Sequence, residues 1–146
     1  MQVAINTRNL SIARILADIY KTIDFQDEVI RLVTEVQLEE QGVDGKGRSL
    51  GEYADFTKNI RSALGLRIDH VTLKLTGEYY ESHSVKGVSG GFVIISDSVK
   101  DAVTDLADVY GEDIVGLNEN SIAELSVFLI DEVRERTRKK IFANIR

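Results

Sequence analysis

The 146-residue sequence contains no cysteine, no proline and no tryptophan. Without cysteine, the chain has no disulfide, no thiolate nucleophile and no cysteine-based zinc or iron–sulfur site. Without proline, it has no Pro-rich linker or polyproline ligand segment. The longest purely aliphatic or aromatic runs are four residues, Phe92–Ile95 and Val127–Ile130, whereas a membrane-spanning helix needs about 20. The N-terminus lacks a charged stretch followed by an apolar core, so we expect no secretory signal.

The overall composition is that of a globular protein. Hydrophobic residues make up 43 % of the chain and charged residues 29 %, both near the average for folded domains. The length predicts a single domain over residues 1–146. The net charge of −6 argues against a general duplex-DNA-binding role, because such proteins carry a basic surface.

The positions of the glycines divide the chain. All 11 lie between Gly42 and Gly116, so both ends are free of glycine. Because glycine costs a helix interior up to about 1 kcal/mol relative to alanine, the ends predict helices and the middle predicts strands and turns. The sequence therefore predicts an α+β fold, with a small antiparallel β-sheet, N-terminal helices and a long C-terminal helix. The expected parts are a helical arm (9–41), a loop and sheet region (42–96) and C-terminal helices (98–146).

The arm predicts two helices. Asn9 or Ser11 can cap the first, which reaches Tyr20. Asp24 can cap the second, and Gly42 can end it. The apolar stripe of the second helix consists of Val29, Val33 and Val36, widened by Ile30.

The middle region predicts one short helix and three strands. The helix follows the turn-rich loop Gly42–Gly51, and we expect it to place on the core Tyr53, Phe56, Ile60, Leu64 and Leu66. Apolar and polar residues alternate over 71–75, which predicts a half-buried strand. Two further strands, Ser82–Val88 and Gly91–Ser96, form a pair. The apolar run Phe92–Ile95 predicts the central strand of the sheet.

The last part predicts two helices. The first is ended by Gly111 and has one apolar face made of Val99, Val103, Leu106 and Tyr110. Ser121 and Glu124 form a capping-box pattern, which predicts the start of the C-terminal helix. Its buried stripe is expected to be Ile122, Leu125, Leu129 and Val133.

Two patterns typical of catalysis are present but incomplete. Residues 87–91 match the G-x-S-x-G nucleophile elbow, yet that elbow needs a helix after the serine and a strand is predicted here. Asp69 and His70 directly precede the predicted strand over 71–75, and if they belong to it their side chains point to opposite faces. We therefore interpret residues 87–91 as a hairpin turn and expect no catalytic, cofactor-binding or metal-binding residue. An enzyme that uses Asp69 and His70 is the most distant alternative.

Three groups of residues are candidates for a partner interface. Asp44, Lys46 and Arg48 lie in the glycine-rich loop. Tyr79 and Tyr80 form an aromatic pair whose simplest interpretation is core, although tyrosine is also common at interfaces. The third group lies at the end of the C-terminal helix and comprises Arg134, Arg136, Arg138, Lys139 and Lys140.

The basic end of the last helix makes the charge distribution uneven. Residues 131–146 hold six basic and three acidic side chains, a net +3, which leaves −9 on the other 130 residues. The simplest interpretation is a solvated helix end that balances the helix dipole. Contact with a neighbouring copy or another protein is an alternative, and contact with nucleic acid is a further one.

Two stretches resemble small bacteriophage virion-morphogenesis and tail-completion proteins. In those proteins a helix ends in a glycine-rich pattern, matched here by Gln41, Gly42, Asp44, Gly47 and Leu50. A later pattern opens a β-hairpin and is matched here by Leu73, Leu75, Thr76, Gly77, Tyr80 and Ser82. Residues 110–117 resemble a segment that leads into the C-terminal helix in versions from phages of Bacteroidetes-type hosts.

The resemblance covers residues 33–120 and implies a function. It implies a non-enzymatic virion structural protein at the head–tail connector, neck or tail-completion position, assembled in the host cytoplasm. Such a protein forms a homomeric ring and docks on other virion proteins such as portal or tail proteins, with no membrane partner and no sequence-specific nucleic acid. The alternative is a small soluble protein-binding or regulatory module of phage or bacterial origin.

Overall fold

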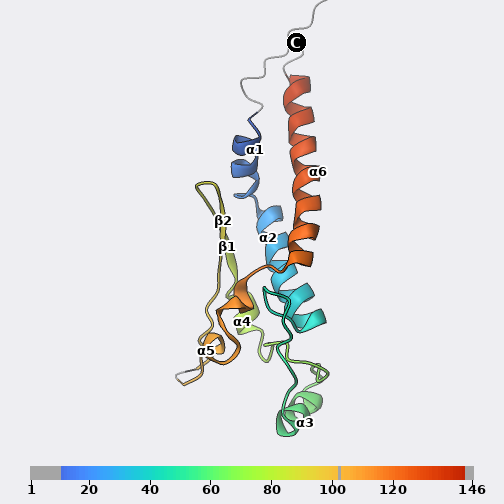
Figure 1. Ribbon diagram of the computed structural model, residues 1–146, viewed down its shortest axis with the longest axis vertical. Coiled ribbons are helices and arrows are strands. Elements are labelled where there is room, and N and C mark those ends of the chain that lie inside the picture. The colour runs from blue at the N-terminus through green and yellow to red at the C-terminus, as the bar shows by residue number, and fades with distance from the viewer. Residues whose placement is uncertain (1–10, 102, 144–146) are drawn as a thin grey trace, which may run out of the picture.

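The computed structural model describes residues 11–101 and 103–143 and shows an elongated molecule (Figure 1). The predicted α+β fold is confirmed, with a small antiparallel sheet, N-terminal helices and a long C-terminal helix. In chain order the elements are α1 (Ile12–Ile19), α2 (Ile23–Arg31), the π-helix η2 (Leu32–Gln41), α3 (Asp55–Ala63), α4 (Glu78–Glu81), β1 (Ser84–Val88), β2 (Gly91–Ile95), α5 (Leu106–Tyr110), the 3-10 helix η3 (Glu112–Val115) and α6 (Glu119–Ala143).

Side-chain caps begin both N-terminal helices. Ser11 Oγ accepts a backbone N–H of the first turn of α1 at 3.4 Å, as predicted. Thr22 Oγ1 does the same for α2 at 3.3 Å. The prediction that Asp24 caps this helix is wrong, because Asp24 lies inside the first turn, where its charge suits the positive end of the helix dipole. Asn9 lies outside the described residues.

The π-helix η2 continues directly from α2. Gly42 ends it with a φ of 62°, in the left-handed region, as predicted. Val29 and Val33 are fully buried and Val36 is half-buried, so the predicted stripe faces the core. Wide helical turns of this kind are rare and are often found at functional or structurally special positions.

Polar contacts tie η2 to the segment before α6. The fully buried Gln37 donates from Nε2 to the carbonyl of Gly116 at 2.9 Å. Its Oε1 accepts the N–H of Asn118 at 2.8 Å. Close by, Gly45 donates its N–H to the carbonyl of Asp113 at 2.8 Å. These bonds fix where the long helix α6 leaves the body.

Helix α3 lies within the predicted range but is turned the opposite way. Phe56, Ile60 and Leu64 are exposed, Phe56 by 75 %. The buried residue of the helix is Arg61. The expectation that this apolar stripe packs on the core is therefore wrong, because the body beside α3 offers polar acceptors to Arg61.

Residues 71–75 form no strand, contrary to prediction. Val71 and Thr72 are both buried, which breaks the two-residue alternation, and Leu73 has a φ of 60°. The N–H of Thr72 donates to the hydroxyl of Tyr53 at 3.0 Å instead of to a neighbouring strand. A side chain thus satisfies the backbone here, and no sheet is needed.

Strands β1 and β2 form an antiparallel hairpin, as predicted. Ser89 and Gly90 make its two-residue turn, so the G-x-S-x-G stretch is a hairpin turn. The expectation of a central strand over Phe92–Ile95 is wrong: the sheet in the described part of the chain has two strands. Val93 and Ile95 consequently remain exposed.

The predicted helix over residues 99–110 is shorter in the structure. Asp101 Oδ1 accepts two backbone N–H groups in a turn, and Val103 is exposed. Helix α5 therefore starts only at Leu106, and Gly111 ends it as predicted.

Helix α6 starts before the predicted capping box. Asn118 Oδ1 accepts the N–H of Ser121 at 2.9 Å, so Asn118 caps the helix and the prediction for Ser121 is wrong. Ile122 is 51 % exposed and leaves the predicted stripe. The other members of that stripe are buried or half-buried: Leu125, Leu129 and Val133.

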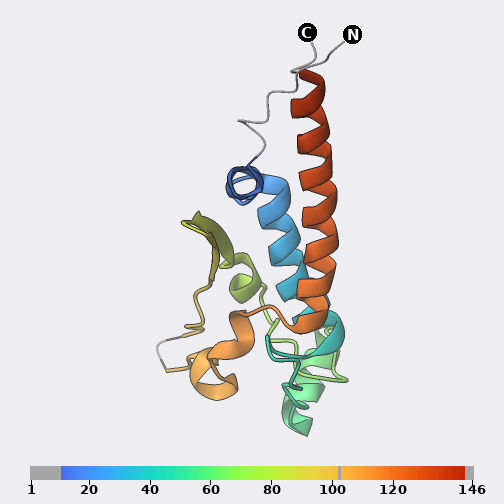
Figure 2. The same cartoon turned by 45° about the horizontal axis from the view of Figure 1, so that its top comes forward.

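The core lies between α1, α2, the hairpin and one side of α6 (Figure 2). Its centre is aromatic, with the rings of Phe25 and Phe92 5.0 Å apart in an edge-to-face arrangement. Tyr20 and Phe128 also contact Phe25. A second cluster around Ile114 joins η2 to α4, α5 and η3.

Candidate functional site

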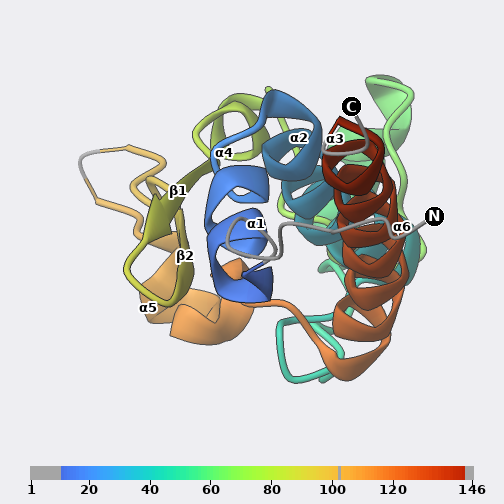
Figure 3. The ribbon, with the colours of Figure 1, turned by 90° about the horizontal axis from the view of Figure 1, so that it is seen from above.

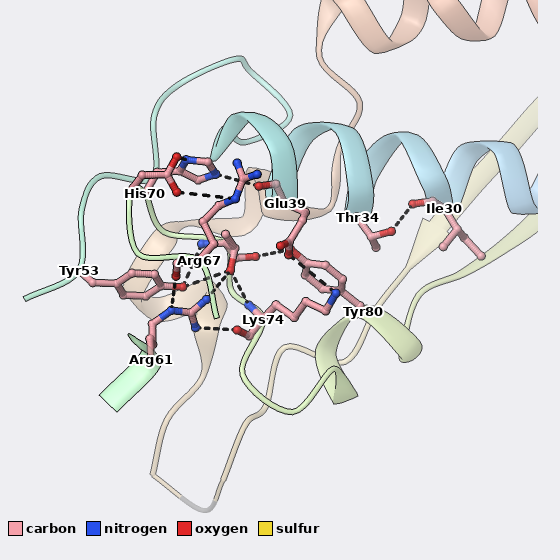
Figure 4. Close-up of polar contacts among 11 residues, drawn as sticks. Ile30, Thr34, Glu39, Tyr53, Arg61, Arg67, His70, Lys74 and Tyr80 are labelled. Atoms are coloured by element: carbon pink, nitrogen blue, oxygen red, sulfur yellow. Dashed lines mark hydrogen bonds and ion pairs between the residues drawn. The ribbon is translucent and has the colours of Figure 1, made fainter. Parts of the chain in front are cut away.

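A buried arginine organises the polar cluster between α3 and η2 (Figure 4). Arg61 is 3 % exposed, and its guanidinium lies 4.2 Å from the centre of the Tyr53 ring. It donates to the carbonyls of Arg67 and Lys74 at 2.8 and 2.6 Å and to Thr72 Oγ1 at 3.1 Å. Carbonyl dipoles and an aromatic face thus stabilise this charge. The arginine holds together residues 67–74, which have no regular structure.

Tyr80 connects this cluster to η2. Its hydroxyl donates to the carbonyl of Thr72 and lies 3.5 Å from Glu39 Oε2, an oxygen that is 3.9 Å from Lys74 Nζ. Burial, together with the nearby Glu39 charge, raises the pKa of Tyr80 far above its ordinary value. Burial also raises the pKa of Tyr79 to about 12. Both hydroxyls are therefore protonated at neutral pH.

A cavity of about 430 Å³ opens beside the cluster, between α3, residues 73–78, residues 97–100 and α5. Tyr53, Tyr79 and Tyr110 line it together with the aliphatic side chains of Ile60, Leu73 and Leu106. Charges of both signs border it, from Lys74, Lys100, Glu78 and Asp97. This lining suits an amphipathic ligand or a partner side chain.

Asp69 and His70 do meet, contrary to expectation. Since residues 71–75 are not a strand, the two side chains are free to approach, and Asp69 Oδ2 lies 3.2 Å from His70 Nδ1. His70 Nε2 donates to the carbonyl of Glu39 at 2.9 Å. The ring also lies against Gly42, where an added Cβ would be 2.3 Å from it. Both ring nitrogens are thus engaged within the fold.

The second histidine, His83, is buried, and we expect it to make the free energy of unfolding depend on pH. Its Nδ1 donates to the carbonyl of Tyr79 at 2.9 Å, and burial lowers its pKa. The unfolded chain binds this proton near pH 6.5 and the folded chain only at lower pH, so stability falls as the pH drops below about 6.5. We expect a loss of at most about 1.4 kcal/mol between pH 7.5 and 5.5. Urea unfolding at both pH values should show it, and a His83→Gln variant with an unchanged loss would contradict it.

The loop residues predicted to form an interface make hydrogen bonds and ion pairs within the same chain. Asp44 is buried, and its carboxylate accepts the N–H groups of Lys46 and Arg48, both at 2.9 Å. The Arg48 guanidinium bridges Asp44 and Asp113, and Lys46 Nζ is 2.9 Å from the same Asp113 carboxylate. The loop is therefore held against η3. The side chains of Lys46 and Arg48 are exposed, and Asp44 positions them.

The basic end of α6 is accompanied by its own acids. Arg138 and Lys139 lie 2.7 and 3.5 Å from the carboxylate of Glu135. Arg136 is 3.6 Å from Glu132. Three of the basic side chains thus have an acidic partner within the helix, and Figure 1 shows this part of α6 extending away from the strands and α3.

Large apolar side chains remain uncovered on α6. Ile122, Val127 and Ile130 are each at least half exposed, and Phe142 near the end of the helix is 65 % exposed. The sequence pattern predicted that Ile122 is buried, and no burial was predicted for Val127 or Ile130. The sequence did contain a signal for these exposed residues. Four consecutive apolar residues, Val127–Ile130, point to all sides of a helix, so they cannot all be buried on one side.

Comparison of the chain with models of known protein families, with curated proteins and with solved structures finds no match. Across residues 11–101 and 103–143, none of the helices has both the length and the apolar character that crossing a bilayer requires. The same ranges contain no group of three or more acidic or histidine side chains arranged to bind a metal ion.

Proposed function

We propose that this protein is a non-enzymatic structural subunit that assembles with copies of itself into a ring. The observation that carries the proposal is α6, a helix of 25 residues with apolar side chains on several sides. Exposed apolar side chains that lie together on a surface often mark a protein–protein contact. The body of a single copy covers one side, so a second copy is the expected cover for Val127 and Ile130.

Charge supports a neighbouring copy as the partner. The C-terminal residues 131–146 carry a net +3 and the rest of the chain −9. A contact between the basic end of one copy and the acidic body of the next is complementary. Such a head-to-tail contact repeats around a ring.

The position of this ring in a virion follows from the resemblance of residues 33–120 to phage proteins. We place the subunit at the head–tail connector, neck or tail-completion position of a tailed phage, in contact with portal, connector or tail proteins. Recovery with neck proteins from disassembled virions is the result this placement requires.

Assembly should depend on the uncovered side of α6. The double variant Val127→Asp and Ile130→Asp is expected to weaken self-association by about 1,000-fold, because hot-spot residues at an interface each contribute at least about 2 kcal/mol. Light scattering over a concentration series, at low and moderate salt, measures the species formed. A large discrete species that dissociates in salt would implicate the basic end, Arg134–Lys140, as well.

The control is Val103→Asp, which makes the same kind of substitution at a side chain that is 94 % exposed and distant from α6 in the chain. It should leave assembly unchanged. Equal effects of the control and the α6 variant would contradict the proposed interface. A monomer at every concentration would favour the second candidate function.

That second candidate is a small protein-binding or regulatory module. The cavity beside Tyr53, Tyr79 and Tyr110 favours it, since a concave site with aromatic walls and a charged rim suits a bound segment. A folded monomer that loses binding of its partner on Ile60→Asp would support this function over ring assembly.

A further inference from the structure

In the described part of the chain, no strand pairs with the outer edge of β2. In a hairpin with a two-residue turn the bonded and non-bonded pairs alternate, so the N–H and C=O groups of Phe92 and Ile94 point away from β1. No hydrogen bond from the described residues reaches these groups. β1 lies toward α2 and β2 is on the other side of the hairpin (Figure 3). β2 also has no charge and no bulge, features that usually protect an edge.

An apolar groove of about 620 Å³ lies beside this edge, between β2 and the first half of α6. Its lining includes Phe92 and Ile94 from β2 and Ile122 and Leu129 from α6, and none of its lining residues is charged. A strand added to β2 would place every second side chain on the Phe92 side of the sheet. Those side chains would enter the groove while the backbone pairs with β2.

The first residues of the chain have the sequence that such a site requires. Met1, Val3 and Ile5 alternate with Gln2, Ala4 and Asn6, and the first charged side chain is Arg8. Alternation with period two and β-branched residues is typical of a strand with one apolar face. An uncharged segment of this kind matches an uncharged groove.

We propose that residues 2–7 of a neighbouring copy add to the outer edge of β2 as a third strand, with Val3 and Ile5 in the groove. The proposal rests on the self-assembly proposed above and names one of its contacts. The segment leads into α1 beside the second half of α6, whereas the groove lies against the first half (Figure 1). A neighbouring copy is assigned as the donor because the proposed ring lets every copy both give and receive a segment. Ten residues precede Ser11 and span up to about 33 Å when extended, enough to reach an adjacent copy.

The added strand would enlarge a sheet that packs on α2 and α6 through Val85 and Phe92. Each copy would donate one segment and receive one, which is a heterologous contact suited to a ring.

The absence of cysteine allows a direct test by disulfide trapping in the full chain. Two variants are made, Ile5→Cys and Ser126→Cys, since Ser126 lines the groove and is exposed. Mixed and mildly oxidised, they should form an interchain disulfide dimer at least ten times faster than a mixture of Asn6→Cys with Ser126→Cys. Asn6 is the matched control because it lies on the opposite face of the expected strand.

The outcomes separate this contact from the proposed function. Equal trapping at positions 5 and 6, or none, would overturn the strand addition, and light scattering of the unmodified chain would still report whether copies assemble. If a double variant carrying both cysteines forms only an intrachain disulfide, residues 2–7 bind the groove of the same copy. The proposed donation by a neighbouring copy would then be wrong. Loss of both assembly and trapping in the Val127→Asp, Ile130→Asp background is expected if the two contacts act in one ring.

Discussion

Replacing Arg61 with alanine is expected to lower the free energy of unfolding by about 3 to 5 kcal/mol. The change removes the donor for the carbonyls of Arg67 and Lys74 and for Thr72 Oγ1, and the cation that lies over Tyr53. Because Arg61 is 3 % exposed, water cannot easily replace these bonds. Urea unfolding followed by circular dichroism measures the loss, since the chain has no tryptophan to report by fluorescence.

The control for this prediction is Lys58→Ala on the same helix. Lys58 forms an ion pair with Glu52 at 3.0 Å near the surface, and its loss should cost less than about 1 kcal/mol. Arg61→Lys should fall between the two, because lysine keeps the charge but lacks the planar fork that reaches three acceptors. Similar losses for Arg61→Ala and Lys58→Ala would show that the buried network contributes little.

Replacing Gly45 with alanine is the second large effect, with an expected loss of about 2 to 4 kcal/mol. An added Cβ would lie 2.6 Å from the carbonyl carbon of Gly116. The obstacle is backbone, and it is held in place because the Gly116 carbonyl accepts the Gln37 amide. Relief of the clash would move the segment before α6 and break the bond from Gly45 to Asp113.

Gly91→Ala is the matched control for this substitution. An added Cβ at Gly91 meets nothing within 4 Å, and the backbone there has no left-handed φ. Its unfolding free energy should stay within about 0.5 kcal/mol of the parent chain. If Gly45→Ala behaved like Gly91→Ala in urea unfolding, the close approach of the loop to residue 116 would not be a constraint on the fold.

The sequence alone predicted the features that depend on neighbouring residues. The cap at Ser11, the helix ends at Gly42 and Gly111 and the hairpin turn at Ser89–Gly90 all follow from local backbone chemistry. The α+β class follows from where glycine is absent. These signals need no knowledge of distant parts of the chain.

The candidate site was harder to predict because its contacts join distant residues. Arg61 bonds to residue 74 and Tyr53 bonds to residue 72, 13 and 19 positions away. Glu39 and Tyr80 are 41 positions apart. Periodicity predicted that Phe56 and Ile60 face the core, and no local pattern indicates that hydrogen-bond acceptors for Arg61 lie on the other side of the helix.

The amino-acid sequence by itself determined the helix and hairpin boundaries that caps, glycines and turn residues encode, and it determined the uneven charge of the chain. Only the tertiary structure decided which faces are covered: Arg61 is buried, Phe56 is exposed, and Val127 and Ile130 on α6 remain open. The physical reason is that the local sequence pattern determines whether a segment forms a helix, a strand or a turn. The burial of a side chain depends instead on which distant parts of the chain pack beside it.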